Sequence, residues 1–184
     1  GHISGDNFQF GNIRGDGSYY FSRLTLVWGW ASWRRVWHNY DVKINSFPSF
    51  KLTGQLDNIP SHAPFKEKWL KNFEETYTGE LNSWDYQYAY LILINNQLSI
   101  LPNINLVSNI GFGEKATHTI TESKLANIPA KNQIEIVHPQ LMLANLQADL
   151  FTQRIEFVEQ KNKSDLSKLW KAIIPSLFQF SFGQ

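Results

Sequence analysis

The residues best suited to chemistry lie in one short segment, Ser83-Trp84-Asp85-Tyr86. Ser83 is a typical helix N-cap, and Asp85 would then lie in the first turn, where the helix dipole favours a negative charge. At the edge of a cleft, the same carboxylate could act as a general base that takes the proton from an attacking hydroxyl. These residues alone leave the structural and the catalytic role of Asp85 equally open.

A second candidate is the aromatic segment Trp28-Gly29-Trp30-Ala31. Trp and Gly at a junction between a strand and a helix often form a packed corner, and this structural role is the stronger expectation from composition. The alternative is a flat aromatic wall for a sugar ring, with glycine allowing close approach of the backbone. Both roles stay open on these residues.

The third candidate is a polar, glycine-bearing loop, Asn109-Ile110-Gly111-Phe112-Gly113, followed by Thr117-His118-Thr119. It could be a surface hairpin with an exposed histidine. It could also close over a diphosphate, with backbone N–H groups and hydroxyls on the phosphate oxygens. His118 could then pair with phosphate or bind a metal through its neutral ring, although one histidine does not make a metal site.

Composition limits the function classes. The chain has 184 residues, a net charge of +1, 15% aromatic and 18% charged residues, and no cysteine. This length fits one domain or a large subdomain, and so many aromatics argue against disorder. No Lys/Arg run reaches five residues, so a nucleic-acid binder is not expected. Without cysteine, disulfides and zinc–thiolate sites are excluded, and no apolar run is long enough to span a bilayer.

Short strands are expected over residues 3–10, 18–28 and 98–101, where β-forming residues gather between turn signals. Helices are expected over 31–40, 64–78 and 83–96, from Pro139 onward with Leu143, Leu146 and Leu150 as its stripe, and over 164–174. Residues 41–60 and 102–119 should be loops. The predicted fold class is therefore mixed α/β, with short strands and several amphipathic helices.

Taken together, these segments resemble a bacterial family of nucleotide-diphospho-sugar transferases. The resemblance covers residues 3–119. It rests on the order and spacing of short matching pieces: Ile3-Ser4-Gly5, Tyr19-Tyr20-Phe21-Ser22, Trp28 to Arg34, Ser83 to Gln87, and Pro102 to Thr119. More distantly, the layout is similar to the C-terminal half of the inverting, metal-dependent N-acetylglucosaminyltransferases, in which a Trp-Asp pair supplies the base and a Phe-Gly loop orders over the nucleotide.

The resemblance implies a GT-A glycosyltransferase in which Asp85 is the base and an acceptor hydroxyl displaces the nucleoside diphosphate with inversion. It implies substrate contacts from Trp28, Gly29, Trp30, Arg34 and Trp84, and nucleotide contacts from Asn109, Gly111, Phe112, Gly113, Thr117 and His118. A divalent metal, Mn²⁺ or Mg²⁺, would assist, with His118 as a candidate ligand. The partners would be a nucleotide-sugar donor and a glycan or other hydroxyl acceptor.

The sequence departs from that pattern because it contains no Asp-x-Asp motif to hold a divalent ion under a sugar diphosphate. Separately, it contains no Gly-x-Gly-x-x-Gly loop. We therefore expect residues 1–137 to form the acceptor-side part, residues 138–184 a helical extension, and the nucleotide-binding half to be missing. The apolar stretch 172–182 could pack on that half or touch a membrane surface, and the expected location is cytoplasmic or membrane-peripheral. The rival hypotheses are a non-catalytic carbohydrate-binding domain, which needs no carboxylate, and a structural or membrane-associating domain.

Overall fold

The computed structural model describes residues 1–61, 63–111, 125–132 and 135–156. Its sheet has the order β2-β4-β1-β3. β1 (His2–Ile3) pairs parallel with β4 (Ser99–Pro102) and antiparallel with β3 (Ala31–Ser32), and β2 (Tyr19–Ser22) pairs antiparallel with β4. The sheet is small and mixed, so the prediction of a mixed α/β chain with short strands is confirmed.

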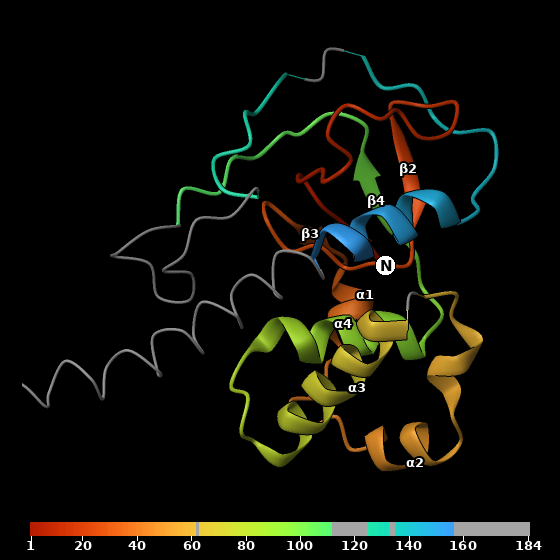
Figure 1. Cartoon of the computed structure of the whole chain (residues 1–184), viewed down its shortest axis with the longest axis vertical. Helices are drawn as coiled ribbons and strands as arrows, with labels where there is room; N and C mark the ends of the chain where they lie inside the picture. Colours follow the sequence, from red (N-terminus) through yellow and green to blue (C-terminus); the bar gives the residue numbers. More distant parts are fainter. Residues whose placement is uncertain (62, 112–124, 133–134, 157–184) are drawn as a thin grey trace, which may run out of the picture.

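The labelled helices lie at one end of the long axis of the molecule, below the sheet in this view (Figure 1). They are α1 (Arg34–Trp37), α2 (Phe47–Leu52), α3 (Ala63–Thr78) and α4 (Trp84–Ile94), and the 3₁₀ helix η1 (Gln55–Asn58) follows α2 along the chain. A further helical segment covers residues 146–156 and crosses beside the sheet.

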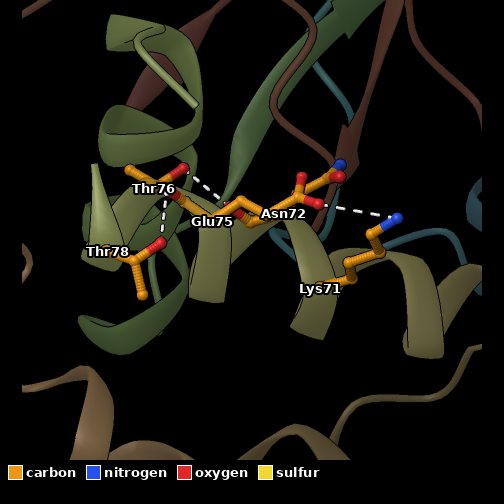
Figure 2. Close-up of polar contacts among 5 residues, drawn as sticks. All are labelled: Lys71, Asn72, Glu75, Thr76 and Thr78. Carbon is orange, nitrogen blue, oxygen red and sulfur yellow. Dashed lines mark hydrogen bonds and ion pairs between the residues drawn. The ribbon is translucent and has the colours of Figure 1, made fainter. Parts of the chain in front are cut away.

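The helix predicted over 64–78 is confirmed as α3. Several of its polar side chains bond within the helix: the Lys71 ammonium lies 3.5 Å from the Glu75 carboxylate one turn on, and the hydroxyl of Thr76 donates to the backbone oxygen of Asn72 (Figure 2). The hydroxyl of Thr78 likewise donates to the backbone oxygen of Glu75 (Figure 2). Asn72 and Thr76 are themselves buried, whereas Lys71 and Thr78 are exposed, so these contacts satisfy polar groups on both the inward and the outward side of α3.

Aromatic rings join α3 to α4. Phe73 is fully buried and lies 5.2 Å from Tyr90 between ring centroids, edge to face, and Trp69 meets Tyr86 in the same way at 6.1 Å. Such pairs contribute about 0.5–1.5 kcal/mol each beyond the burial of apolar area. Of the predicted stripe, only Tyr77 is largely exposed. The two helices therefore form one rigid support for the residues at the start of α4.

The segment 146–156 is fastened to the sheet by buried polar groups. The Ser22 hydroxyl donates to the Asp149 carboxylate at 2.6 Å, and the Gln9 amide donates to the Thr152 hydroxyl at 2.7 Å. Ala148 packs into the same hydrophobic cluster as Tyr20. Buried polar groups that are paired in this way favour one packing arrangement, so these bonds fix the position of the helical segment beside β2.

The helix predicted over 31–40 is largely wrong. Ala31 and Ser32 are extended because they pair with β1, and the helix is limited to Arg34–Trp37. The loop predicted over 41–60 is also wrong, since it contains α2 and η1. Pro48 is a loop signal in the sequence, but it lies in the first turn of α2. The backbone N–H groups there have no acceptor within the helix, so the missing N–H of proline costs no hydrogen bond.

No helix begins at Pro139. The last helical segment starts after Asn145, whose side-chain oxygen accepts a hydrogen bond from the backbone N–H of Ala148 at 3.0 Å, the geometry of an N-cap. Of the predicted stripe, Leu143 is 69% exposed and Leu146 46% exposed. The predicted helix over 164–174 and the stretch 172–182 lie outside the described residues, and the division after residue 137 stays a prediction.

Candidate functional site

Two of the segments singled out in the sequence meet in space. The indole rings of Trp30, just before β3, and Trp84, the first residue of α4, stack with centroids 4.9 Å apart and planes 27° from parallel. Because Asp85 follows Trp84 directly in the first turn of α4, the predicted wall and the predicted base share one region of the surface.

The stacked indoles belong to a larger group that we call the aromatic cluster: Trp30, Trp37, Tyr40, Trp84 and Tyr88. Trp37 lies flat on Tyr40, with centroids 4.6 Å apart and planes 9° from parallel, and both Trp30 and Trp37 contact Tyr88. Tyr88 is fully buried, whereas Trp37 and Trp84 are each 42% exposed. The cluster therefore has Tyr88 buried beneath it and an exposed rim formed by the indoles of Trp37 and Trp84.

Asp85 is half-buried beside this rim. Ser83 occupies the N-cap position, as predicted, but its hydroxyl donates to the carboxylate of Asp85 and makes no capping bond to the backbone. This carboxylate affects the pKa values of two nearby phenols. The pKa of Tyr40 is raised by burial and then by Asp85, and the pKa of Tyr86 is raised to about 12 by the same two causes first. Burial and the nearby carboxylate thus both favour the protonated form of the two phenols.

Tyr40 is a site residue that the sequence marks only by a packing signal, its helical spacing from Trp37. Its hydroxyl donates to the side-chain oxygen of Gln87 and lies 3.4 Å from the backbone oxygen of Trp84. These bonds hold the aromatic cluster against the first turn of α4. His2 is also new to the site: its ring stacks on Trp30 at 6.1 Å and contacts Tyr88.

The other predicted substrate contacts are divided. Trp28 packs edge to face on Phe8 at 5.0 Å, against the core beside the sheet. Gly29 has φ = +60°, and a Cβ atom there would lie 2.3 Å from a methyl group of Val107. Arg34 is exposed at the start of α1. Of the five predicted contacts, the structure thus brings Trp30 and Trp84 together, while Trp28 has a packing role and Gly29 a conformational one.

Asp6 stands alone in the sequence because it forms no Asp-x-Asp pair. In the fold it is buried beneath the turn at Trp28, accepting hydrogen bonds from the Ser4 hydroxyl and, at 3.4 Å, from the backbone N–H of Trp28. Burial raises the pKa of Asp6 to about 7, against the lowering effect of those bonds. A buried acid of this kind is a common feature near functional sites, and the spacing Ser4-x-Asp6 is its only signal in the sequence.

Only part of the predicted nucleotide loop can be placed. The side-chain oxygen of Asn109 accepts a hydrogen bond from the N–H of Gly111 at 2.8 Å; Asn109 is half-buried and Gly111 is exposed. Phe112, Gly113, Thr117 and His118 lie outside the described residues. Within the described ranges, no three His, Asp or Glu side chains lie close enough to hold a metal ion. The divalent metal and the role of His118 as a ligand stay predictions.

Comparisons of the chain with models of protein families, with curated proteins and with solved structures found no match. Among the helices of the described part of the chain, none has the length and apolar character needed to cross a membrane. A function for this chain is therefore inferred from the geometry at the start of α4.

Proposed function

We propose that this chain forms the acceptor side of a nucleotide-sugar-dependent glycosyltransferase, with Asp85 as the general base. The supporting observation is the stack of Trp30 on Trp84, which sets an exposed indole next to a carboxyl group at a helix N-terminus. An indole offers a broad apolar face to a sugar ring, and the adjoining carboxylate can accept a proton from one of the ring's hydroxyls.

In this mechanism the acceptor sugar lies on the exposed rim of the aromatic cluster. Asp85 takes the proton of one acceptor hydroxyl while that oxygen forms a bond to the anomeric carbon of the donor. The bond from the anomeric carbon to the diphosphate breaks, the diphosphate leaves with its electron pair, and the configuration inverts. Ser83 would orient the carboxylate through its hydroxyl, since it already donates to it.

The finer parts of this proposal follow the resemblance stated above. They are a GT-A fold, a nucleotide-sugar donor, contacts from the 109–118 loop and a cytoplasmic or membrane-peripheral location. A divalent metal would neutralise the leaving diphosphate, but no step is assigned to the described residues through it. The small mixed sheet with helices on one side is compatible with such a fold and does not identify it.

A carbohydrate-binding domain without catalysis is the second candidate, because Trp37 and Trp84 alone would provide a binding face. Both candidates predict that the protein binds a glycan on an array and that Trp84→Ala abolishes this binding. They differ in the role of Asp85, because a base is needed for transfer and not for binding. Asp85→Asn should therefore leave array binding intact under either candidate, and it should lower sugar transfer only if the first candidate is correct. Array binding that survives Trp84→Ala would remove both candidates at this site.

A further inference from the structure

A second concave site lies at the other end of α4. It is a groove of about 690 Å³ between α2, η1 and the last turn of α4, with Arg23 at its edge. Its polar lining consists largely of hydroxyl and amide side chains, among them Ser46, Ser49, Thr53, Gln55, Asn58 and Asn96. Leu93 is eight residues beyond Asp85, which is about 12 Å along a helix, so the groove is separate from the site described above.

Arg23 is the one charged residue among those described as lining the groove. Its guanidinium donates to the side-chain oxygen of Asn96 at 2.8 Å, which fixes it at the exposed rim, while the Asp149 carboxylate behind it is buried. A guanidinium has five N–H donors in a planar fork that matches a carboxylate or a phosphate. An anion in the groove would therefore meet a positioned donor and no competing carboxylate in the described lining.

The rest of the lining is suited to a sugar. The hydroxyls of Ser46 and Tyr90 lie 2.8 Å apart, so both are already positioned. Hydroxyls and amides both donate and accept, as the hydroxyls of a sugar require. Phe50, Leu93 and Ile94 add apolar surface for the ring faces. A volume of this size fits a ligand of small-molecule dimensions. A nucleic acid would need several cations along the groove, and this lining offers one.

We propose that this groove binds an oligosaccharide segment that carries one anionic group, with the guanidinium of Arg23 on the anion. The nearby charges fit one anion and not several. Burial raises the pKa of Tyr90, the hydrogen bond with Ser46 lowers it, and the Asp41 carboxylate raises it, so one carboxylate acts near the groove. Asp149 is buried and accepts from the backbone N–H of Arg23 at 3.1 Å, and Lys51 on α2 is paired with Glu74 at 2.6 Å. The proposal does not depend on sugar transfer at Asp85.

The test is a titration of ¹⁵N-labelled protein followed by amide chemical shifts. The acidic probes are 3′-sialyllactose and an aldobiouronic acid, each with one carboxylate, lactose is the neutral probe and inorganic phosphate is the bare anion. We expect an acidic probe to shift the amides of Ser49, Thr53 and Asn96 saturably. Arg23→Gln should weaken that binding at least about tenfold, the loss expected for a charge-assisted hydrogen bond. Lys71→Gln removes an equal charge at an exposed position on α3, and it should leave the binding of the acidic probe unchanged.

Ser49→Trp is the second variant, because Ser49 is exposed and an indole there would fill the groove without touching the core. It should block binding even if Arg23→Gln disturbs the fold. Trp84→Ala should leave these shifts intact, which separates this proposal from the site at Asp85. The proposal is overturned if neither acidic probe gives saturable shifts, if Ser49→Trp binds like the wild type, or if phosphate alone binds as tightly as the acidic sugars.

Discussion

The indole of Trp84 lies on the indole of Trp30 with the ring centroids 4.9 Å apart, although the two residues come from separate segments of the chain. This contact places Asp85 beside an exposed aromatic rim, and it fixes α4 against the strand side of the molecule. Both the structure around this contact and its chemistry can be tested by substitution.

Trp30 and Trp84 should be energetically coupled. In a double-mutant cycle of Trp30→Ala and Trp84→Ala, the free energies of urea unfolding should deviate from additivity by about 0.5–1.5 kcal/mol, the range for an aromatic pair. The matched control combines Trp84→Ala with Tyr77→Ala, a similarly exposed ring on α3. That pair should be additive. Additivity of Trp30 and Trp84 within error would show that the stack does not form.

Gly29→Ala should destabilise the fold by about 1–3 kcal/mol, because the new Cβ is strained at φ = +60° and overlaps Val107. Val107→Ala in the same chain removes the methyl group that lies 2.3 Å away, and the nearest remaining atom of residue 107 would be 3.2 Å away. Gly29→Ala should therefore cost less stability in the Val107→Ala background than in the wild type, as measured by thermal unfolding. Equal costs of Gly29→Ala in both backgrounds would contradict the predicted contact.

Asp6→Asn should relieve a pH-dependent cost. Because burial raises the pKa of Asp6 to about 7, the folded carboxyl keeps its proton where the unfolded chain loses it, so this group makes wild-type stability fall as pH rises from about 4 to 7. Relative to wild type, the variant should gain about 2–4 kcal/mol between pH 4 and pH 8. The comparison is made at each pH, because burial lowers the pKa of His2 to about 4 and gives it the opposite slope.

Asp16→Asn is the matched control for this experiment, since it makes the same change of side chain at an exposed position. Glu156 is a second carboxyl with a raised pKa, about 7, caused first by burial, against the lowering effect of Lys68, and then by the nearby Asp6. Measuring Asp6→Asn, Glu156→Gln and the double variant across the same pH range therefore shows which carboxyl causes the change of stability with pH. A difference between Asp6→Asn and wild type that does not change with pH would mean that Asp6 is ionised in the fold at neutral pH.

The parts of the fold that sequence could predict are those fixed by local pattern. The spacing of Phe65, Trp69 and Phe73 determines α3, and Ser83 marks the start of α4. The parts that it could not predict depend on distant partners. Ala31 and Ser32 have a helix-like context but are extended because His2 and Ile3 pair with them, and no local signal carries that information.

The candidate site follows the same rule. Trp30, Trp84 and Asp85 each stand out in the sequence, but only the fold brings them together. Asp6 could not be predicted because its neighbours in space, Ser4 and the N–H of Trp28, include a backbone group that has no sequence signature. Conversely, Trp28 resembles Trp30 in its sequence context, yet it packs on Phe8, since the turn at Gly29 sends the two indoles in different directions.

The most direct test of the central proposal is the effect of Asp85→Asn on sugar transfer. The full polypeptide that carries this sequence is incubated with UDP- and GDP-sugars, Mn²⁺ and an acceptor glycan identified on the array, and released nucleoside diphosphate is measured. The amide oxygen of the substituted side chain can still accept from the Ser83 hydroxyl, so the fold and glycan binding should be kept. Glu80→Gln, at an exposed position nearby in the sequence, is the matched control.

We predict that Asp85→Asn lowers turnover about 10²–10⁴-fold, the usual effect of losing a general base, while Glu80→Gln transfers like the wild type. Transfer by Asp85→Asn at the wild-type rate would contradict the assignment of Asp85 as the base. Glycan binding with no transfer by the wild type, for any of these donors, would contradict the transferase and leave the carbohydrate-binding domain.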